Sequence, residues 1–206
     1  GLLDSVGIER RVGLAEGTAD ARPSSSFGSE DAPLYATAAR TLATLSGPFV
    51  ALMFPLAAHY PYVYPGKPAK EEATHAAYRK SAAEMDRLLG QMVDIFRAKQ
   101  LDRNTLFVFV GDHGESFNEH GLLAHNSSLF EEEITVPLLF WSSDGRLRHP
   151  EVLRGRELDI GPTILDWFGI ETDSAPVQGT SLLRYNAKPW LYLSTFFDDL
   201  GLGLLQ

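Results

Sequence analysis

The chain has 206 residues, of which 44% are hydrophobic and 22% charged, so its length and composition fit a folded globular domain with a buried core. The formal net charge is −9 and the basic residues do not cluster, which excludes nucleic acid as a leading partner because polyanion binding needs a basic face. Cysteine is absent, and this excludes disulfides, zinc ribbons and a thiol nucleophile within the chain.

The N-terminal part changes from loop-like to regular sequence. Residues 1–30 are rich in Gly, Ser, Arg and acidic side chains and predict loop, most clearly at 22–26 (Arg-Pro-Ser-Ser-Ser), with no catalytic residue. An Ala- and Leu-rich pattern predicts a helix over 32–46. The apolar run 49–54 lacks alternation and predicts a strand buried on both faces. The longer apolar stretch 48–58 is far shorter than the roughly 20 residues of a membrane helix.

A long amphipathic helix is predicted over 71–99. Its apolar side chains recur at spacings of three and four, which places them on one buried stripe: Tyr78, Ala82, Met85, Leu89, Met92 and Phe96. The opposite face is charged and should be solvated, at Arg79, Lys80, Asp86 and Arg87.

The C-terminal half alternates strands with short helices. Continuous apolar runs predict strands at 106–110 and 136–141, and 190–197 is a further strand candidate. Between the first two strands, a Ser-x-x-Glu capping box at 128–131 predicts a short helix. Residues 159–169 predict a helix with a polar cap, an early Pro and a terminal Gly. The order strand, helix, strand implies an α/β fold with a mainly parallel sheet. The sequence has no internal repeat and no low-complexity tract long enough to be a linker, which predicts one structural unit.

The stretch 111–126 carries acids, imidazoles and glycines directly behind an apolar strand, where a parallel sheet places its active site. A carboxylate and a neutral imidazole are good ligands for Zn²⁺ or Mn²⁺, and the following glycine allows a sharp turn. We therefore predict that Asp112 and His113 bind a divalent metal ion. Because such an ion wants four or more donors, its other ligands must come from elsewhere.

Two further histidines are candidates for catalysis. A protonated His125 could hold an anionic oxygen or protonate a leaving group. His59 follows the first predicted strand and could approach the same cavity from a neighbouring strand end. We expect Glu115 and His120 to contact the metal-binding or catalytic side chains, or to fix their loop, without touching the metal ion or the substrate.

Alternative interpretations stay open at this point. Asp112 could serve only to orient His113 in a hydrogen-bonded turn, and His59 could be a partly exposed loop residue. No functional role is expected for the solvated helix face at 131–133 or for the surface histidines His75 and His149.

The run 111–141 resembles the sulfatase and alkaline phosphatase superfamily. In that family an Asp-His-Gly-Glu strand end is followed by Glu-His-Gly, a substrate-side His or Lys, and a Val-Pro strand. The resemblance continues in a strand ending in His-x-Pro at 48–62, a long helix at 78–102, and Asp-Ile-x-Pro-Thr and Gly-x-Ser-Leu segments within 158–183. It covers about 31–183.

The resemblance implies a three-layer α/β/α domain of the alkaline phosphatase type with a mainly parallel sheet, here incomplete. It implies Asp112 and His113 as ligands of a divalent ion (Ca²⁺, Mn²⁺ or Zn²⁺). It also implies that His59 and His125 contact the transferred sulfuryl or phosphoryl group and its leaving oxygen.

The sequence departs from the family in lacking a nucleophile. Members carry one or two acidic ligands and a metal-bound Thr, Ser or formylglycine, the last made within Cys/Ser-x-Pro-x-Arg. Here 21–25 imitates that motif, with alanine at the nucleophile position and serine in place of the final arginine. We therefore interpret 1–206 as the C-terminal portion of a sulfatase-like domain that is inactive alone.

The resemblance implies a metal-dependent sulfuric ester hydrolase. This branch of the superfamily is favoured because the loop 115–121 is more similar to the corresponding loop of sulfatases. A phosphoglycerol or phosphoethanolamine transferase of the same superfamily is the alternative, and a non-catalytic binding or regulatory module is an alternative of another class. The partners would be small-molecule or lipid-linked sulfate or phosphate esters. No membrane segment is predicted in this chain, although the parent protein could carry an anchor, and by analogy it would lie outside the cytoplasm.

Overall fold

The computed structural model describes residues 7–10, 23–25, 28–29, 31–68, 72–126, 128–147, 154–171, 177–184, 191–194 and 202–205. They belong to two compact units, one within Gly1–Leu101 and one within Asp102–Gln206.

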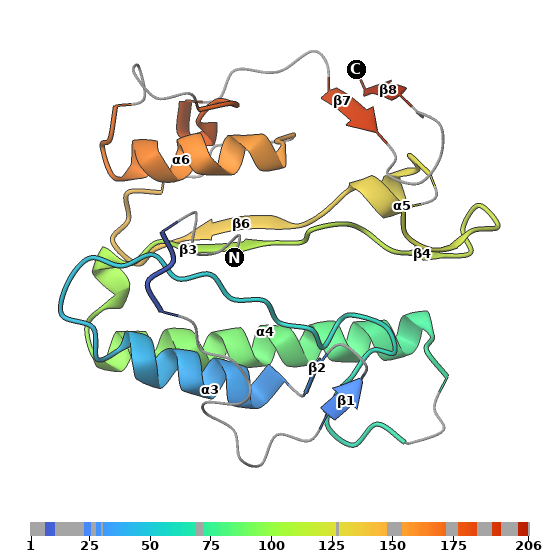
Figure 1. Cartoon of the computed structure of the whole chain (residues 1–206), viewed down its shortest axis with the longest axis horizontal. Helices are drawn as coiled ribbons and strands as arrows, with labels where there is room; N and C mark the ends of the chain where they lie inside the picture. Colours follow the sequence, from blue (N-terminus) through green and yellow to red (C-terminus); the bar gives the residue numbers. More distant parts are fainter. Residues whose placement is uncertain are drawn as a thin grey trace. The chain divides into compact units, whose positions relative to one another are not determined.

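The first unit is built on two packed helices, α3 (Asp31–Leu42) and α4 (His75–Ala98), which lie side by side in Figure 1. The predicted helices are therefore confirmed, α3 with a shorter C-terminal end. Thr74 caps the N-terminus of α4, because its Oγ1 accepts a hydrogen bond from the Ala77 N–H at 3.2 Å. Its predicted charged face is exposed. Met92 and Phe96 of the predicted stripe are buried, whereas nearer the N-terminus the buried residues are Ala77, Ser81 and Leu88, each one position before a predicted one.

Two local predictions for this unit are wrong. Residues 49–54 form no strand, and Val50, Leu52 and Phe54 are 89%, 63% and 71% exposed. A strand needs a hydrogen-bonding neighbour, and no strand in the described part of the chain pairs with this run. Conversely, part of the predicted loop 22–26 forms strand β1 (Pro23–Ser25), which pairs irregularly with β2 (Gly28–Ser29).

The second unit begins with a 3₁₀ turn, η1 (Asp102–Asn104), and strand β3 (Phe107–Val110). Strand β3 pairs with β6 (Leu138–Trp141) in an antiparallel register that sets Phe107 opposite Trp141. The connection between them contains a hairpin, β4 (Ser116–Phe117) with β5 (Leu123–Ala124), and the one-turn helix α5 (Glu131–Ile134).

The mainly parallel sheet and its three layers are not confirmed. Each of the four described sheets has two strands in antiparallel order, including β7 (Leu191–Ser194) with β8 (Leu202–Leu205). The predicted strand at 190–197 is thus confirmed for its described residues. A parallel pair needs a long crossover, usually an α-helix, and the four residues of α5 do not provide one between β3 and β6.

Helix α6 (Ile160–Trp167) follows the 3₁₀ turn η2 (Glu157–Asp159) and ends before Gly169, whose φ is +71°. The helix is confirmed, but the Asp159 side chain does not cap it. This fully buried carboxylate instead accepts hydrogen bonds from the Arg156 N–H at 3.0 Å and the Thr180 N–H at 2.8 Å. It therefore fixes the segment that leads to η3 (Leu182–Arg184).

No helix among the described residues has both the length and the apolar character needed to cross a bilayer.

Candidate functional site

The Asp-His pair lies in the turn that follows β3. The Gly111 N–H donates to the Pro137 carbonyl at 3.2 Å, which continues the β3–β6 ladder to the start of this turn. The Asp112 side chain is 91% exposed and that of His113 is 32% exposed. Asp112 Oδ1 accepts a hydrogen bond from the His113 N–H at 3.1 Å and lies 3.8 Å from His113 Nε2. The two side chains therefore share one side of the turn.

A second contact sets the His113 tautomer. His113 Nδ1 lies 2.8 Å from the Gly114 carbonyl oxygen, which can only accept. The ring proton of a neutral imidazole is then on Nδ1, and Nε2 presents its lone pair on the side of Asp112. Two ligands about 2.1 Å from one ion lie roughly 3 to 3.5 Å apart, so a small rotation of the exposed Asp112 would suffice. This donor pair fits a divalent ion.

His125 packs directly on His113. Their rings stack with centroids 3.7 Å apart and an interplanar angle of 26°. The Glu115 carboxylate accepts a hydrogen bond from His125 Nδ1 at 2.8 Å, and both side chains are largely shielded, at 15% and 26% exposure. Potential ligand atoms of His113, Glu115 and His125 lie within 4.8 Å of one another. The structure thus brings together four of the predicted site residues.

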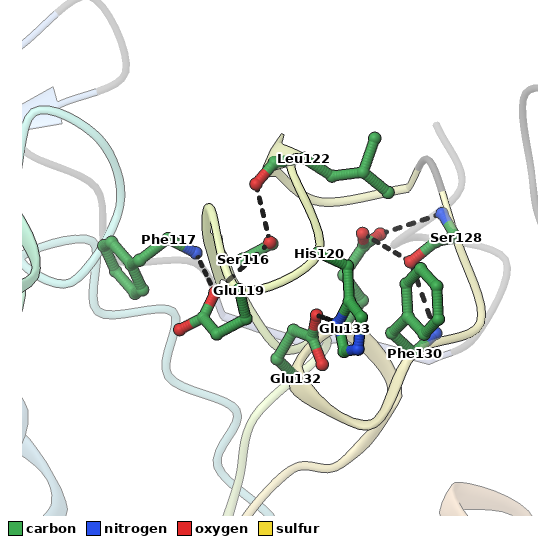
Figure 2. Close-up of polar contacts among 9 residues, drawn as sticks. All are labelled: Ser116, Phe117, Glu119, His120, Leu122, Ser128, Phe130, Glu132 and Glu133. Atoms are coloured by element: carbon green, nitrogen blue, oxygen red, sulfur yellow. Dashed lines mark hydrogen bonds and ion pairs between the residues drawn. The ribbon is translucent and has the colours of Figure 1, made fainter.

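The hairpin β4–β5 lies between His113 and His125 in the sequence and reverses the direction of the chain. The buried Ser116 donates its hydroxyl hydrogen to the Leu122 carbonyl at 2.8 Å, and the Phe117 N–H donates to a Glu119 carboxylate oxygen at 2.6 Å (Figure 2). These bonds shape the tip of the hairpin, which returns residue 125 to the start of the loop.

Helix α5 holds the same turn from its other end. The Gly114 N–H donates to the Glu133 carbonyl at 2.8 Å. A Cβ on Gly114 would lie only 2.1 Å from the Glu132 carbonyl oxygen, so this close backbone approach requires glycine. The turn that carries Asp112 and His113 is therefore fixed against the first turn of α5.

Two acidic side chains of α5 bind the loop, as Figure 2 shows. Glu132 lies 2.6 Å from His120 Nδ1, and the His120 ring stacks on Phe130 with centroids 3.8 Å apart. The buried Glu133 accepts hydrogen bonds from the Ser128 N–H at 3.1 Å and hydroxyl at 2.7 Å. His120 thus contacts α5 rather than the Asp-His pair.

These contacts correct two predictions. The capping box of Ser128 with Glu131 is wrong, because Phe130 is the N-cap of α5 and Ser128 forms its hydrogen bonds with the Glu133 carboxylate instead. The solvated face at 131–133 is wrong for Glu133, which is only 5% exposed, although Glu131 is exposed. Sequence spacing gave no signal for these bonds because they form between a loop and a helix turn.

His59 lies in the first unit, in a tight turn that precedes a cis Tyr60–Pro61 bond. It is half-buried, and its Nδ1 lies 2.8 Å from the Tyr60 carbonyl oxygen. His75 is exposed at the start of α4, as predicted, and His149 lies outside the described residues.

Comparison with known proteins places the chain in a family. A family model described as Sulfatase matches residues 11–170. The chain is 33% identical over 136 residues to arylsulfatase K of Mus musculus, covering 59% of this chain. It is 32% identical over 116 residues to the multifunctional alkaline phosphatase superfamily protein PehA of Trinickia caryophylli, covering 55%. It is 24% identical over 214 residues to the lipoteichoic acid synthase-like protein YvgJ of Bacillus subtilis, covering 93%.

The matches cover 24%, 22% and 34% of these three relatives, respectively. The family model itself spans well over half of the chain, and it includes the Asp-His turn, the hairpin and α5. The chain therefore belongs to the sulfatase family.

Proposed function

We propose that this chain supplies part of the active site of a metal-dependent hydrolase of sulfate esters. The observation that carries the proposal is the pairing of Asp112 with His113. The His113 tautomer is set by the Gly114 carbonyl, and its Nε2 lies 3.8 Å from Asp112 Oδ1. Asp112 and His113 would hold the divalent ion, with Ca²⁺, Mn²⁺ and Zn²⁺ as the candidates. When bound, such an ion offsets negative charge that develops on the ester oxygens.

His125 is proposed to bind the transferred group or to protonate the departing oxygen. Glu115 holds its Nδ1–H, which orients the ring and leaves Nε2 as the atom that gives or takes a proton. Stacking against His113 keeps that imidazole beside the proposed metal ligand. Glu115 thus acts on the site by orienting His125, whereas His120 fixes the loop through Glu132.

His59 is proposed as the second histidine that contacts the transferred group. Its backbone is constrained from both sides, because its N–H donates to the Leu56 carbonyl at 3.0 Å and its carbonyl accepts from the Tyr62 N–H at 2.7 Å. A substrate-binding imidazole benefits from such constraint, since positioning lowers the entropic cost of reaching the transition state.

The nucleophile is assigned to residues outside this sequence. The chain has no cysteine, and its imitation of the Cys/Ser-x-Pro-x-Arg motif has Ala21 at the nucleophile position. Because a sulfatase site of this kind needs that group, we propose that the isolated chain does not turn over esters. The proposed location outside the cytoplasm rests on the family alone.

A phosphotransferase is the second candidate. It is favoured by one observation: the match to the lipoteichoic acid synthase-like protein extends over 93% of this chain, against 59% for arylsulfatase K. The Asp-His pair and the two histidines would serve either reaction, and only the acceptor of the transferred group differs. A lipid-linked phosphate ester would then replace the sulfate ester as substrate.

The test uses the complete protein that carries this sequence, assayed on aryl sulfate, aryl phosphate and phosphoglycerol lipid substrates. We expect His125→Ala and His59→Ala to lower turnover by about 10²- to 10⁴-fold, while the control His75→Ala leaves it unchanged. Preference for the sulfate ester supports the sulfatase, and transfer to an alcohol supports the transferase. Unchanged turnover in both histidine variants contradicts their assignment, and a wild-type protein inert on every ester supports a non-catalytic module.

A further inference from the structure

A buried carboxylate holds the turn that leads to His59. Asp31, the first residue of α3, is 5% exposed. Its Oδ1 accepts a hydrogen bond from the Leu56 N–H at 2.8 Å, and its Oδ2 accepts one from the Ala57 N–H at 2.9 Å. Both carboxylate oxygens are thus committed to consecutive backbone amides that lie 25 and 26 positions away in the sequence.

The same short segment fixes the backbone of His59. Leu56, whose N–H binds Asp31, also accepts the His59 N–H through its carbonyl at 3.0 Å. Ala57, the other residue that binds Asp31, accepts the Val63 N–H through its carbonyl at 2.8 Å. Asp31 therefore binds the two residues, Leu56 and Ala57, whose carbonyls accept the backbone hydrogen bonds of this turn from His59 and Val63.

The carboxylate occupies an electrostatically costly position. Burial raises the pKa of Asp31, the two backbone hydrogen bonds oppose this rise, and the negative charge of Glu84 on α4 adds to it. An apolar residue at the start of α3 would avoid this cost but would leave the Leu56 and Ala57 amides without their acceptor. The hydrogen bonds to the Leu56 and Ala57 amides thus offset part of the cost of burying the Asp31 carboxylate.

We propose that Asp31 is a positioning residue that sets the place of the His59 imidazole through the amides of Leu56 and Ala57. The inference rests on the proposed function for the part of His59 in turnover. The hydrogen-bonded link between Asp31 and the turn is independent of that function.

The first experiment measures the turn itself by amide hydrogen exchange and by the imidazole NMR signals of His59 in the complete protein. In Asp31→Asn, one acceptor oxygen becomes an amide donor that faces a backbone N–H. We expect the Leu56 and Ala57 amides to exchange about tenfold faster or more, and the His59 signals to shift. The control Asp86→Asn changes an exposed carboxylate of α4 and leaves both readouts unchanged. Unchanged exchange at both amides in Asp31→Asn overturns the inference.

The second experiment is a double-mutant cycle on kcat. We expect Asp31→Asn to lower kcat by about ten- to a hundredfold in the wild-type background and to have little further effect in His59→Ala. An equal loss in both backgrounds means that Asp31 acts on folding and not through His59, which overturns the inference. If Asp31→Asn does not fold, Asp31→Glu keeps both acceptor oxygens, lengthens the side chain by one methylene, and enters the same cycle.

The two proposals fail in distinguishable ways. A His59→Ala variant with full turnover rejects the catalytic role of His59 by itself. Exchange at Leu56 and Ala57 tests the hold of Asp31 on the turn whatever that variant does.

Discussion

Substitution of Gly114 by alanine tests how tightly the Asp-His turn is fixed to α5. The added Cβ would lie 2.1 Å from the Glu132 carbonyl oxygen and 2.9 and 3.0 Å from two backbone carbonyl carbons. An ordinary contact distance is about 3.5 Å, so the two backbone segments must separate by roughly 1 Å or more. The Gly114 N–H then loses its bond to the Glu133 carbonyl.

The expected cost combines two effects. Overpacking costs about 1–3 kcal/mol and loss of the hydrogen bond about 1 kcal/mol, so Gly114→Ala should lower the free energy of unfolding by about 2–4 kcal/mol. Because the same displacement moves Asp112 and His113, turnover in the complete protein should fall by about 10²-fold.

The assay is denaturant unfolding followed by the fluorescence of Trp141 and Trp167, which lie in the same unit as Gly114. The matched control is Gly161→Ala in α6, where an added Cβ meets no atom within 4 Å. This control should keep or slightly raise stability, since alanine favours the helix. A Gly114→Ala protein with stability and turnover within error of wild type would refute the close packing of the turn on α5.

Three further substitutions probe single polar contacts. Glu133→Gln should lower the free energy of unfolding by about 1–3 kcal/mol in the same denaturation assay, because the buried side chain loses one acceptor oxygen for Ser128. The control Glu131→Gln, at an exposed position, should change the free energy of unfolding by less than about 0.5 kcal/mol. The raised pKa of Asp31 means that its contribution to stability is full below about pH 3.8 and is lost as the pH rises through the folded-state pKa. The free energy of unfolding of the wild type relative to that of Asp31→Asn should therefore decline over this pH interval. A difference that does not change with pH would contradict the effect of burial on this carboxyl group. The Ser181 hydroxyl, with Arg184 assisting, lowers the pKa of Asp166, so Ser181→Ala should raise the carboxyl titration midpoint followed by NMR, and an unmoved midpoint would show that the hydroxyl does not stabilise the charged form.

The sequence predicted those elements whose signal is local. The helix α4 follows from apolar spacing, and β3 and β6 follow from short continuous apolar runs. It failed for 49–54, because an apolar run predicts burial but not the neighbour that would provide it. It also failed for the relative direction of β3 and β6, since strand direction depends on how the connection folds rather than on the strands themselves.

The candidate site was predictable where chemistry and sequence position coincide. Asp112 and His113 follow a strand end, and the structure brings the His125 ring onto that of His113 although twelve positions separate the two in the sequence. The contacts of Glu132 with His120 and of Glu133 with Ser128 were not predicted. An acidic run on a short helix has the same sequence pattern whether its side chains are solvated or bind a loop. The relation of His59 to the other residues stays a prediction.

The most direct measurement is anomalous diffraction from crystals of the complete protein grown with Mn²⁺. If Asp112 and His113 grip a cation, an anomalous peak will lie about 2.0–2.3 Å from an Asp112 carboxylate oxygen and from His113 Nε2, and it will vanish in His113→Ala. A peak bound by other residues alone, or no peak beside this pair at saturating Mn²⁺, would contradict the proposed metal site.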